Sequence, residues 1–305
     1  MVMMKRLCLF VILLFVALLF SCSDSLKEDK DKEIKERSKK PYTDIKLDTP
    51  ILLEYSFQKV PDNKSIILNG EIDIELKIIP DVKDEDKFFV FTADFDFKAT
   101  MIKIKTGENN NALFSFKIDE LSIDIPNLRV DYQSKYVDKY LNPQIKKINL
   151  LVKKVIPVQV SEFGVIRIDT AGFFEKHANL KQKITDEHLE KIRLIIGYFF
   201  LKYPKKPKKA EESFYSATPF PANYMIDSLT KDKTGILIIP KGVTKNIDKD
   251  TIASFIKGWI MIDKSTGFLK KNFLQFVKKK YMKSNKLKFL VEEKIIIDLS
   301  ISDKQ

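Results

Sequence analysis

The sequence predicts an α+β protein: a curved antiparallel sheet, shaped as a half-open barrel, with two or three helices packed on one side. Three observations lead to this expectation. Long segments alternate apolar and polar residues, segments with helical periodicity lie only in the middle of the chain, and strand-like segments resume after them. This order of elements is typical of α+β folds. The 305 residues include 23 Phe and only 9 Gly, which suits long strands.

The first strands are predicted from period-two alternation after residue 50. Segment 72–78 places Ile or Leu at every second position, with charged residues between them. Segment 89–101 continues the pattern at greater length, at about 3.3 Å per residue, so a strand of about 40 Å should curve. Its apolar face carries Phe89, Phe91, Ala93, Phe95, Phe97, Ala99 and Met101. The apolar phase then shifts to Ile102 and Ile104, which predicts a bulge.

The middle of the chain contains the helical segments. After a turn at 106–111 and a strand at 113–125, apolar residues recur every three or four positions over 137–152, with a break at Asn142-Pro143. A hairpin is expected over 156–171, and a longer amphipathic helix from a cap at Thr185 to near Pro204. The remaining strands are expected at 224–229, 235–239, 252–262, 268–282 and 287–301.

The first 21 residues have the pattern of an export signal. Lys5 and Arg6 precede an apolar run from Leu7 to Phe20, which at 14 residues is short for a membrane span of about 20. Ser21 and Cys22 follow it. An uncleaved N-terminal anchor is the alternative interpretation.

The four residues Leu19-Phe20-Ser21-Cys22 resemble the lipobox of bacterial lipoproteins, in the relaxed form typical of spirochaetes. Phe20 departs from the strict pattern, in which a small residue is usual. The resemblance implies cleavage before Cys22, a diacylglycerol on its sulfur and an acyl group such as palmitate on its new amine. Two or more acyl chains are enough for stable membrane anchoring.

Residues 22–49 are predicted to be a charged, flexible tether, and residues 50–305 a single folded body. Between Ser23 and Lys40, 13 of 18 residues are charged and only Leu26 and Ile34 are apolar. Such a composition cannot bury enough surface to fold alone.

The net charge of +12 does not indicate a nucleic-acid partner. Only five of the 54 basic residues are Arg, and the lysines are interleaved with Asp and Glu. Nucleic-acid readers depend on the Arg fork for phosphates and base edges. Attraction to anionic lipid headgroups stays open. Because Cys8 lies in the leader, no disulfide is expected in the body, and Cys22 is the candidate lipidation site.

No pattern in the sequence supports catalysis, a metal site or a cofactor. Ser228-x-x-Lys231 and the triplet 233–235 imitate penicillin-binding enzymes, but they lie too close together and the third motif is missing. His177 and His188 lack the spacing of zinc ligands. Acidic rows at 71–75 and 94–96 are what the wet face of any alternating strand produces. The protein is therefore expected not to be an enzyme.

The order of elements resembles the LolA/LppX-like half-barrel lipoproteins, a group that includes members of unknown function. The features that carry the resemblance are the hairpin 158–166, the amphipathic helix ending at Tyr203-Pro204 and the turn 263–267. It implies a lipid or another apolar ligand in a half-barrel cavity, with Phe89, Phe91, Phe95 and Phe97 as candidate lining residues. A plain packed core would use the same residues.

Three function classes stay open from the sequence: a lipid-handling module, a surface lipoprotein that binds another protein such as a host factor, and a structural envelope protein. All three need a membrane anchor. The expected location is the cell envelope, in the outer rather than the inner membrane, with the side of the membrane left open.

Overall fold

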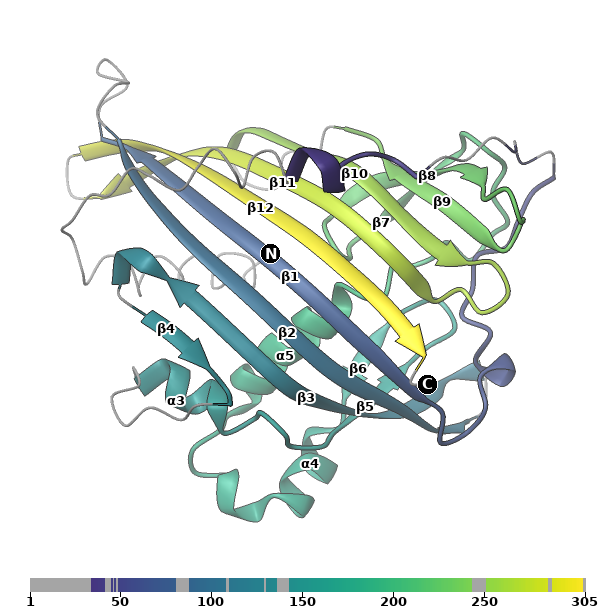
Figure 1. Ribbon diagram of the computed structural model, residues 1–305, viewed down its shortest axis with the longest axis horizontal. Helices are drawn as coiled ribbons and strands as arrows, with labels where there is room; N and C mark the ends of the chain where they lie inside the picture. Colours follow the sequence, from purple (N-terminus) through teal and green to yellow (C-terminus); the bar gives the residue numbers. More distant parts are fainter. Residues whose placement is uncertain are drawn as a thin grey trace.

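The computed structural model describes residues 34–41, 45, 47, 49–80, 88–107, 110–128, 130–135, 143–242, 251–284 and 287–303. Within them the chain forms one curved sheet of 12 strands, in the order β6-β5-β3-β2-β1-β12-β11-β10-β9-β8-β7, with β4 paired to β3 (Figure 1). Each pairing between its strands is antiparallel. The predicted fold class, an α+β half-barrel, is confirmed.

Six long strands form the centre of the sheet: β1 (Ser65–Ile79), β2 (Phe89–Thr106), β3 (Ala112–Ile125), β10 (Thr251–Asp263), β11 (Leu269–Ser284) and β12 (Leu287–Asp303). The shorter strands flank them: β4 (Val130–Gln133), β5 (Ile156–Val160), β6 (Ile166–Ile168), β7 (Ser213–Ser216), β8 (Ala222–Leu229) and β9 (Gly235–Pro240). Because β1 pairs with β12, the first and last long strands join the two halves of the chain.

The described helices that carry labels are short. They are α3 (Pro143–Asn149), α4 (Thr170–Lys176), α5 (Asp186–Gly197) and the 3-10 turns η1 (Phe57–Lys59), η3 (Pro126–Leu128) and η4 (Ala178–Leu180). Helix α5 begins with a capping box, in which Thr185 and His188 satisfy each other's backbone N–H. It lies behind the long strands in Figure 1 and packs on one face of the sheet through Leu189, Ile192 and Ile196. We call this face the inner face.

Alternation along the strands sets the two faces. Ile72 lies opposite Phe95 on β2 and Ile297 on β12, and all three belong to the inner face. Glu71 lies opposite Asp96 and Asp298, so these carboxylates share the outer face. The main apolar core fills the space between the inner face, α5 and the segment that follows α5.

Three sequence-based expectations need correction. The expected strand up to residue 171 ends at Ile168, because Asp169 accepts a hydrogen bond from the Gly172 N–H (2.9 Å) and starts α4. The amphipathic helix ends at Gly197 rather than near residue 204. The apolar phase does not shift after Met101: Lys103 is buried, Ile104 is exposed, and the register shift comes between Lys103 and Lys105. The helical segment expected at 137–141 lies outside the described residues.

Candidate functional site

The four candidate Phe residues lie on the inner face of β2, since each is opposite an inner-face position of β1. Phe97 is 8% exposed and packs on Phe199 beyond α5, with ring centroids 5.7 Å apart. Phe91 is equally buried but belongs to a second apolar cluster. Phe95 lies between the two clusters, and Phe89 is 50% exposed. The row therefore runs from a packed core to solvent, and its role as ligand lining stays a prediction.

One end of the half-barrel, at the start of β1 and the end of β12, is closed by buried aromatic rings. We call it the closed end; its rings are Tyr55, Phe57, Phe114, Phe200, Tyr203 and Phe268. Tyr55 stacks on Tyr203 with centroids 4.7 Å apart. The Tyr203 hydroxyl donates to the Gly267 carbonyl (2.6 Å), and the Tyr55 hydroxyl donates to the Leu201 carbonyl (3.1 Å). Burial raises the pKa of both phenols, so both act as donors.

Lys103 completes the closed end. Its ammonium donates to the carbonyls of Phe57 (2.9 Å) and Val60 (2.6 Å) and lies 3.0 Å from Asp62. These contacts hold the segment before β1 against β2. A buried charge is tolerated when paired and hydrogen-bonded in this way.

The other end of the half-barrel contains the end of β1, the start of β2 and the join of β11 to β12; we call it the hairpin end. Its inner face carries the second apolar cluster: Leu76, Phe91, Ala93, Ile123, Ile125, Tyr132, Ile145 and Val291. Among the described elements outside the long strands, the short helix α3, strand β4 and the turn η3 contribute residues to this cluster. Phe88 (44% exposed) and Phe89 lie at the rim, and Lys77 is 3.9 Å above the Phe88 ring.

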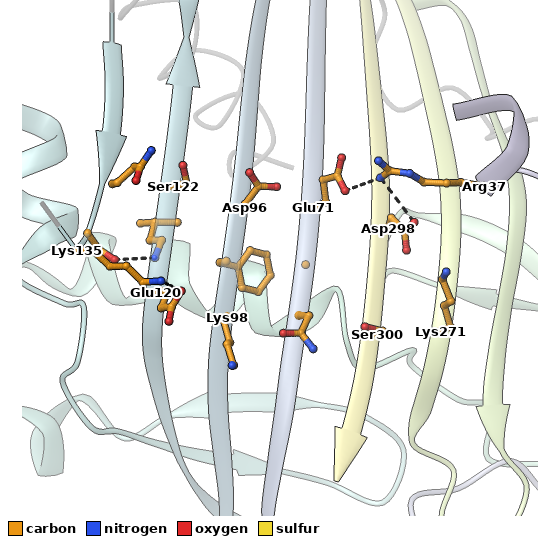
Figure 2. A pocket seen from close by; sticks show the side chains of 16 residues that line it. Arg37, Glu71, Asp96, Lys98, Glu120, Ser122, Lys135, Lys271, Asp298 and Ser300 are labelled. Atoms are coloured by element: carbon orange, nitrogen blue, oxygen red, sulfur yellow. Dashed lines mark hydrogen bonds and ion pairs between the residues drawn. The ribbon is translucent and has the colours of Figure 1, made fainter. Parts of the chain in front are cut away.

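The outer face holds an open hollow of about 730 Å³ over β1, β2, β3, β11 and β12 (Figure 2). Its charged lining residues are Arg37, Glu71, Asp96, Lys98, Glu120, Lys135, Lys271 and Asp298, four cations and four carboxylates. Burial raises the pKa of Asp298, and so does Glu71, against the opposing effect of Lys271 and Arg37. The hollow therefore offers charges of both signs to a partner, beside an apolar patch made by Phe97 and Leu121.

The N-terminal segment docks beside this hollow. Residues 34–37 form a helical turn, and Ile34 packs on an outer-face cluster that includes Trp259, Phe273 and Ile296. Arg37 pairs with Glu71 and lies 3.8 Å from Asp298 (Figure 2). We call residues 34–41 the docked segment.

The N-terminal region makes further contacts with the body, both at the end of the docked segment and after it. Lys40 pairs with Asp227 at 2.6 Å, and Ile45 forms a bridge with Leu229. Leu47 is buried in the main core. Contacts with the body thus begin before residue 50, earlier than the sequence predicted, while Cys22 and the leader lie outside the described residues.

The structure does not assemble the catalytic motifs that the sequence imitates. Ser228 is 6% exposed on β8 and donates to Asp227 (2.7 Å). His188 caps α5, and burial lowers its pKa. His177 packs against Phe173, with ring centroids 4.9 Å apart and ring planes tilted by 55°, and both are far along the chain from either acidic row. Among the described residues, no group of three or more His, Cys, Asp or Glu is placed to hold a metal ion.

Sequence reasoning missed two charged residues on the inner face, Lys278 and Glu293. They lie directly opposite each other on β11 and β12. The signal was present: Lys278 follows Leu274 and Phe276 at the same two-residue spacing, but the run of three lysines from 278 to 280 conceals the alternation.

Comparisons with known proteins leave the family open. Neither a scan against models of protein families nor a search of curated proteins gives a match. One similar solved structure is a lipovitellin, from work on lipid–protein interactions in that protein, at 11% identity and a TM-score of 0.46. The alignment covers 80% of this chain and 26% of the lipovitellin chain, so the chain spans about a quarter of that protein's length. None of the helices within the described residues is long and apolar enough for a membrane span.

Proposed function

We propose that the protein is a non-enzymatic envelope lipoprotein, anchored through a lipid on Cys22, whose body binds an apolar ligand on its inner face. The observation that carries the proposal is a mismatch of lengths. Strand β2 has 18 residues and spans about 60 Å, whereas α5 has 12 residues and spans about 18 Å. The inner face at the hairpin end is apolar, and among the described elements the short segments α3, β4 and η3 supply its cover in place of α5.

The two ends of the half-barrel differ in the room that they leave for a ligand, and this difference indicates where the ligand enters. The closed end is filled by aromatic rings with satisfied hydroxyl groups, which leaves little room for a guest. At the hairpin end the described elements that cover the sheet are short, and Phe88 and Phe89 are exposed at its rim. Ligand sites are usually apolar concave surfaces of this kind. Entry at the hairpin end follows from this arrangement.

The proposal is tested on residues 22–305 carrying Cys22→Ala, which keeps the body free of the lipid anchor. Organic extraction and mass spectrometry should detect copurified lipid, and the protein should take up a fluorescent acyl probe. Phe89→Asp should weaken uptake, while Val90→Asp, the next residue on the opposite face of β2, should not. Absence of both lipid and probe uptake would contradict the proposal.

The anchored location is part of the same proposal and rests on the lipobox resemblance. We place the protein in the outer rather than the inner membrane, with the side of exposure undecided. Protease treatment of intact cells, with detection of the body by antibody, separates surface exposure from a periplasmic orientation.

The polar outer hollow favours a second candidate, a lipoprotein that binds another protein. Its mixed charges suit a polar protein surface better than a lipid chain. Lys98→Glu or Lys271→Glu should then weaken binding of that partner without changing acyl-probe uptake. The reverse pattern favours the ligand-binding function.

A further inference from the structure

We propose that a lysine-rich loop at the β7 edge of the sheet docks the body on an anionic bilayer surface, beside the lipid anchor. We call residues 202–212 the basic loop, and Tyr215 and Leu52 flank it. The inference rests on the anchoring through Cys22 in the proposed function. It adds a second membrane contact and the lipid charge that this contact recognises.

The basic loop carries an excess of exposed positive charge. It contains five lysines and two glutamates, a formal charge of +3. Lys202, Lys205, Lys206 and Lys209 are exposed. Within the part of the chain that the structure describes, no ion pair includes any of these four side chains. The Glu212 carboxylate accepts a hydrogen bond from the backbone N–H of Lys209 (3.1 Å). The four ammonium groups are therefore open to an external anion.

The backbone of the basic loop is held in place although its lysine side chains are exposed. Lys208 and Ile51 exchange two backbone hydrogen bonds, each of 2.8 Å. The N–H of Lys202 donates to the Ser216 hydroxyl (3.0 Å), and Tyr203 is buried at the closed end. Binding by a loop that is already ordered costs less conformational entropy than binding by a disordered run. A run of lysines that only solvates the surface needs no such attachment.

Two exposed apolar side chains flank the basic loop. Tyr215 is 63% exposed and Leu52 is 41% exposed. Leu52 follows the residue that bridges Lys208, and Tyr215 precedes the residue whose hydroxyl accepts from Lys202. Tyrosine is enriched at membrane–water interfaces, and clustered lysines are attracted to anionic headgroups. The combination suits a bilayer surface better than a soluble polyanion.

The flank of the basic loop lies on the same face as the N-terminal segment. Tyr215 lies opposite Asn223 on β8, and alternation along β8 places Asp227 on that face as well. Lys40 of the docked segment pairs with Asp227 at 2.6 Å. Four residues along β8 and one strand spacing put Tyr215 roughly 14 Å from Asp227. An anchor at the N-terminus therefore raises the effective concentration of lipid headgroups near the basic loop.

Vesicle binding tests the proposal without the lipid anchor. Residues 22–305 with Cys22→Ala, the reference protein, should sediment with vesicles of phosphatidylglycerol and phosphatidylcholine in about equal parts, and not with phosphatidylcholine alone. Binding should weaken as salt is added. The triple variant Lys205→Gln, Lys206→Gln, Lys209→Gln should lower the partition coefficient roughly a hundredfold, at about fivefold per lysine.

A second triple variant is the matched control. Lys176, Lys181 and Lys183 are exposed and lie in α4 and in the turns between α4 and α5. These segments pack on the inner face through Phe173 and Leu180. Changing the three lysines to Gln removes the same charge and should leave the partition coefficient within about twofold. Equal losses in the two triple variants would attribute binding to net charge and overturn the proposal.

Fluorescence reports whether the flank meets the bilayer. Trp259, the single Trp of the chain, is 5% exposed, so its emission should not respond to vesicles. In Tyr215→Trp, the emission should shift to shorter wavelength with the anionic vesicles and be quenched by brominated lipids. An unchanged emission, together with lysine-dependent binding of heparin, would show that the basic loop recognises a soluble polyanion and would refute membrane docking.

The anchor and the basic loop fail in different experiments. Loss of the palmitate label at Cys22 tests the anchored function, and that result does not affect vesicle binding by the reference protein. If the reference protein does not bind the anionic vesicles, membrane docking by the basic loop is wrong while the anchor stands.

Discussion

Of the four candidate Phe residues, Phe97 gives the clearest test of whether they are packed core or ligand lining. Its ring lies over Gly70 on the neighbouring strand, so close that a Cβ at Gly70 would come within 2.3 Å of it. It also packs edge-on against Phe199. Because Gly70 has no side chain to fill the space, Phe97→Ala should leave an uncollapsed cavity and cost about 3–5 kcal/mol. Phe89→Ala, at a half-exposed position, should cost less than about 1.5 kcal/mol.

Urea unfolding followed by circular dichroism measures both variants, and the loss for Phe97→Ala should lower the melting temperature by roughly 6 °C or more. A double-mutant cycle with Gly70→Ala tests the geometry directly. Gly70→Ala alone should destabilise by about 1–3 kcal/mol through overpacking, and less in the Phe97→Ala background, where the methyl group has space. A loss below about 1 kcal/mol for Phe97→Ala, or equal losses for Phe97 and Phe89, would refute this account of the core.

Four further outcomes are expected. Cys22→Ala should abolish metabolic labelling with palmitate and leave the precursor uncleaved; persistent labelling would place the lipid elsewhere. Tyr203→Phe should cost about 1–3 kcal/mol in urea unfolding, since the buried Gly267 carbonyl loses its donor, and an unchanged midpoint would contradict that bond. Burial raises the pKa of Asp263, but hydrogen bonds from its own turn and a nearby lysine leave it below its usual value. Its stabilising effect is therefore present above about pH 4 and lost as the pH falls through the lowered pKa, so Asp263→Asn should flatten the acid limb of urea midpoints measured from pH 7 to 3. Ser228→Ala should leave acyl-probe uptake unchanged, and covalent capture of a β-lactam by Ser228 would revive the enzyme interpretation.

The sheet was predictable because its signal is local. Each long strand alternates apolar and polar residues over its own length, so the inner positions of β1 and β2 follow from neighbouring residues alone. The cluster to which each Phe belongs does not follow. Phe91 packs near α3 and β4, whereas Phe97 packs near Phe199, and these partners depend on how the middle of the chain folds over the sheet.

Long-range pairing explains what composition missed in the N-terminal region. The segment before residue 50 is highly charged, and read alone it predicts a tether. Arg37 pairs with Glu71, 34 residues away, and approaches Asp298, at the other end of the chain. Asp96, Glu71 and Asp298 are directly opposite one another on three adjacent strands, an arrangement of like charges that destabilises a sheet. A guanidinium placed on that row offsets the repulsion, so the charge that suggested disorder in the sequence is used for docking.

Docking of residues 34–41 also shortens the distance that the chain can span between a lipid anchor and the body. If the lipid is on Cys22, only the eleven residues that separate it from Ile34 remain to span the distance from the bilayer to the outer face. At most about 3.3–3.6 Å per residue, they reach roughly 40 Å, whereas a tether extending to residue 49 would reach about 90 Å. Because Ile34 and Arg37 fix the docked segment over β12 and its neighbours, a lipid on Cys22 would hold the body by its outer face. The inner face and its hairpin end are on the opposite side of the sheet, which leaves the proposed ligand entry clear of the attachment point.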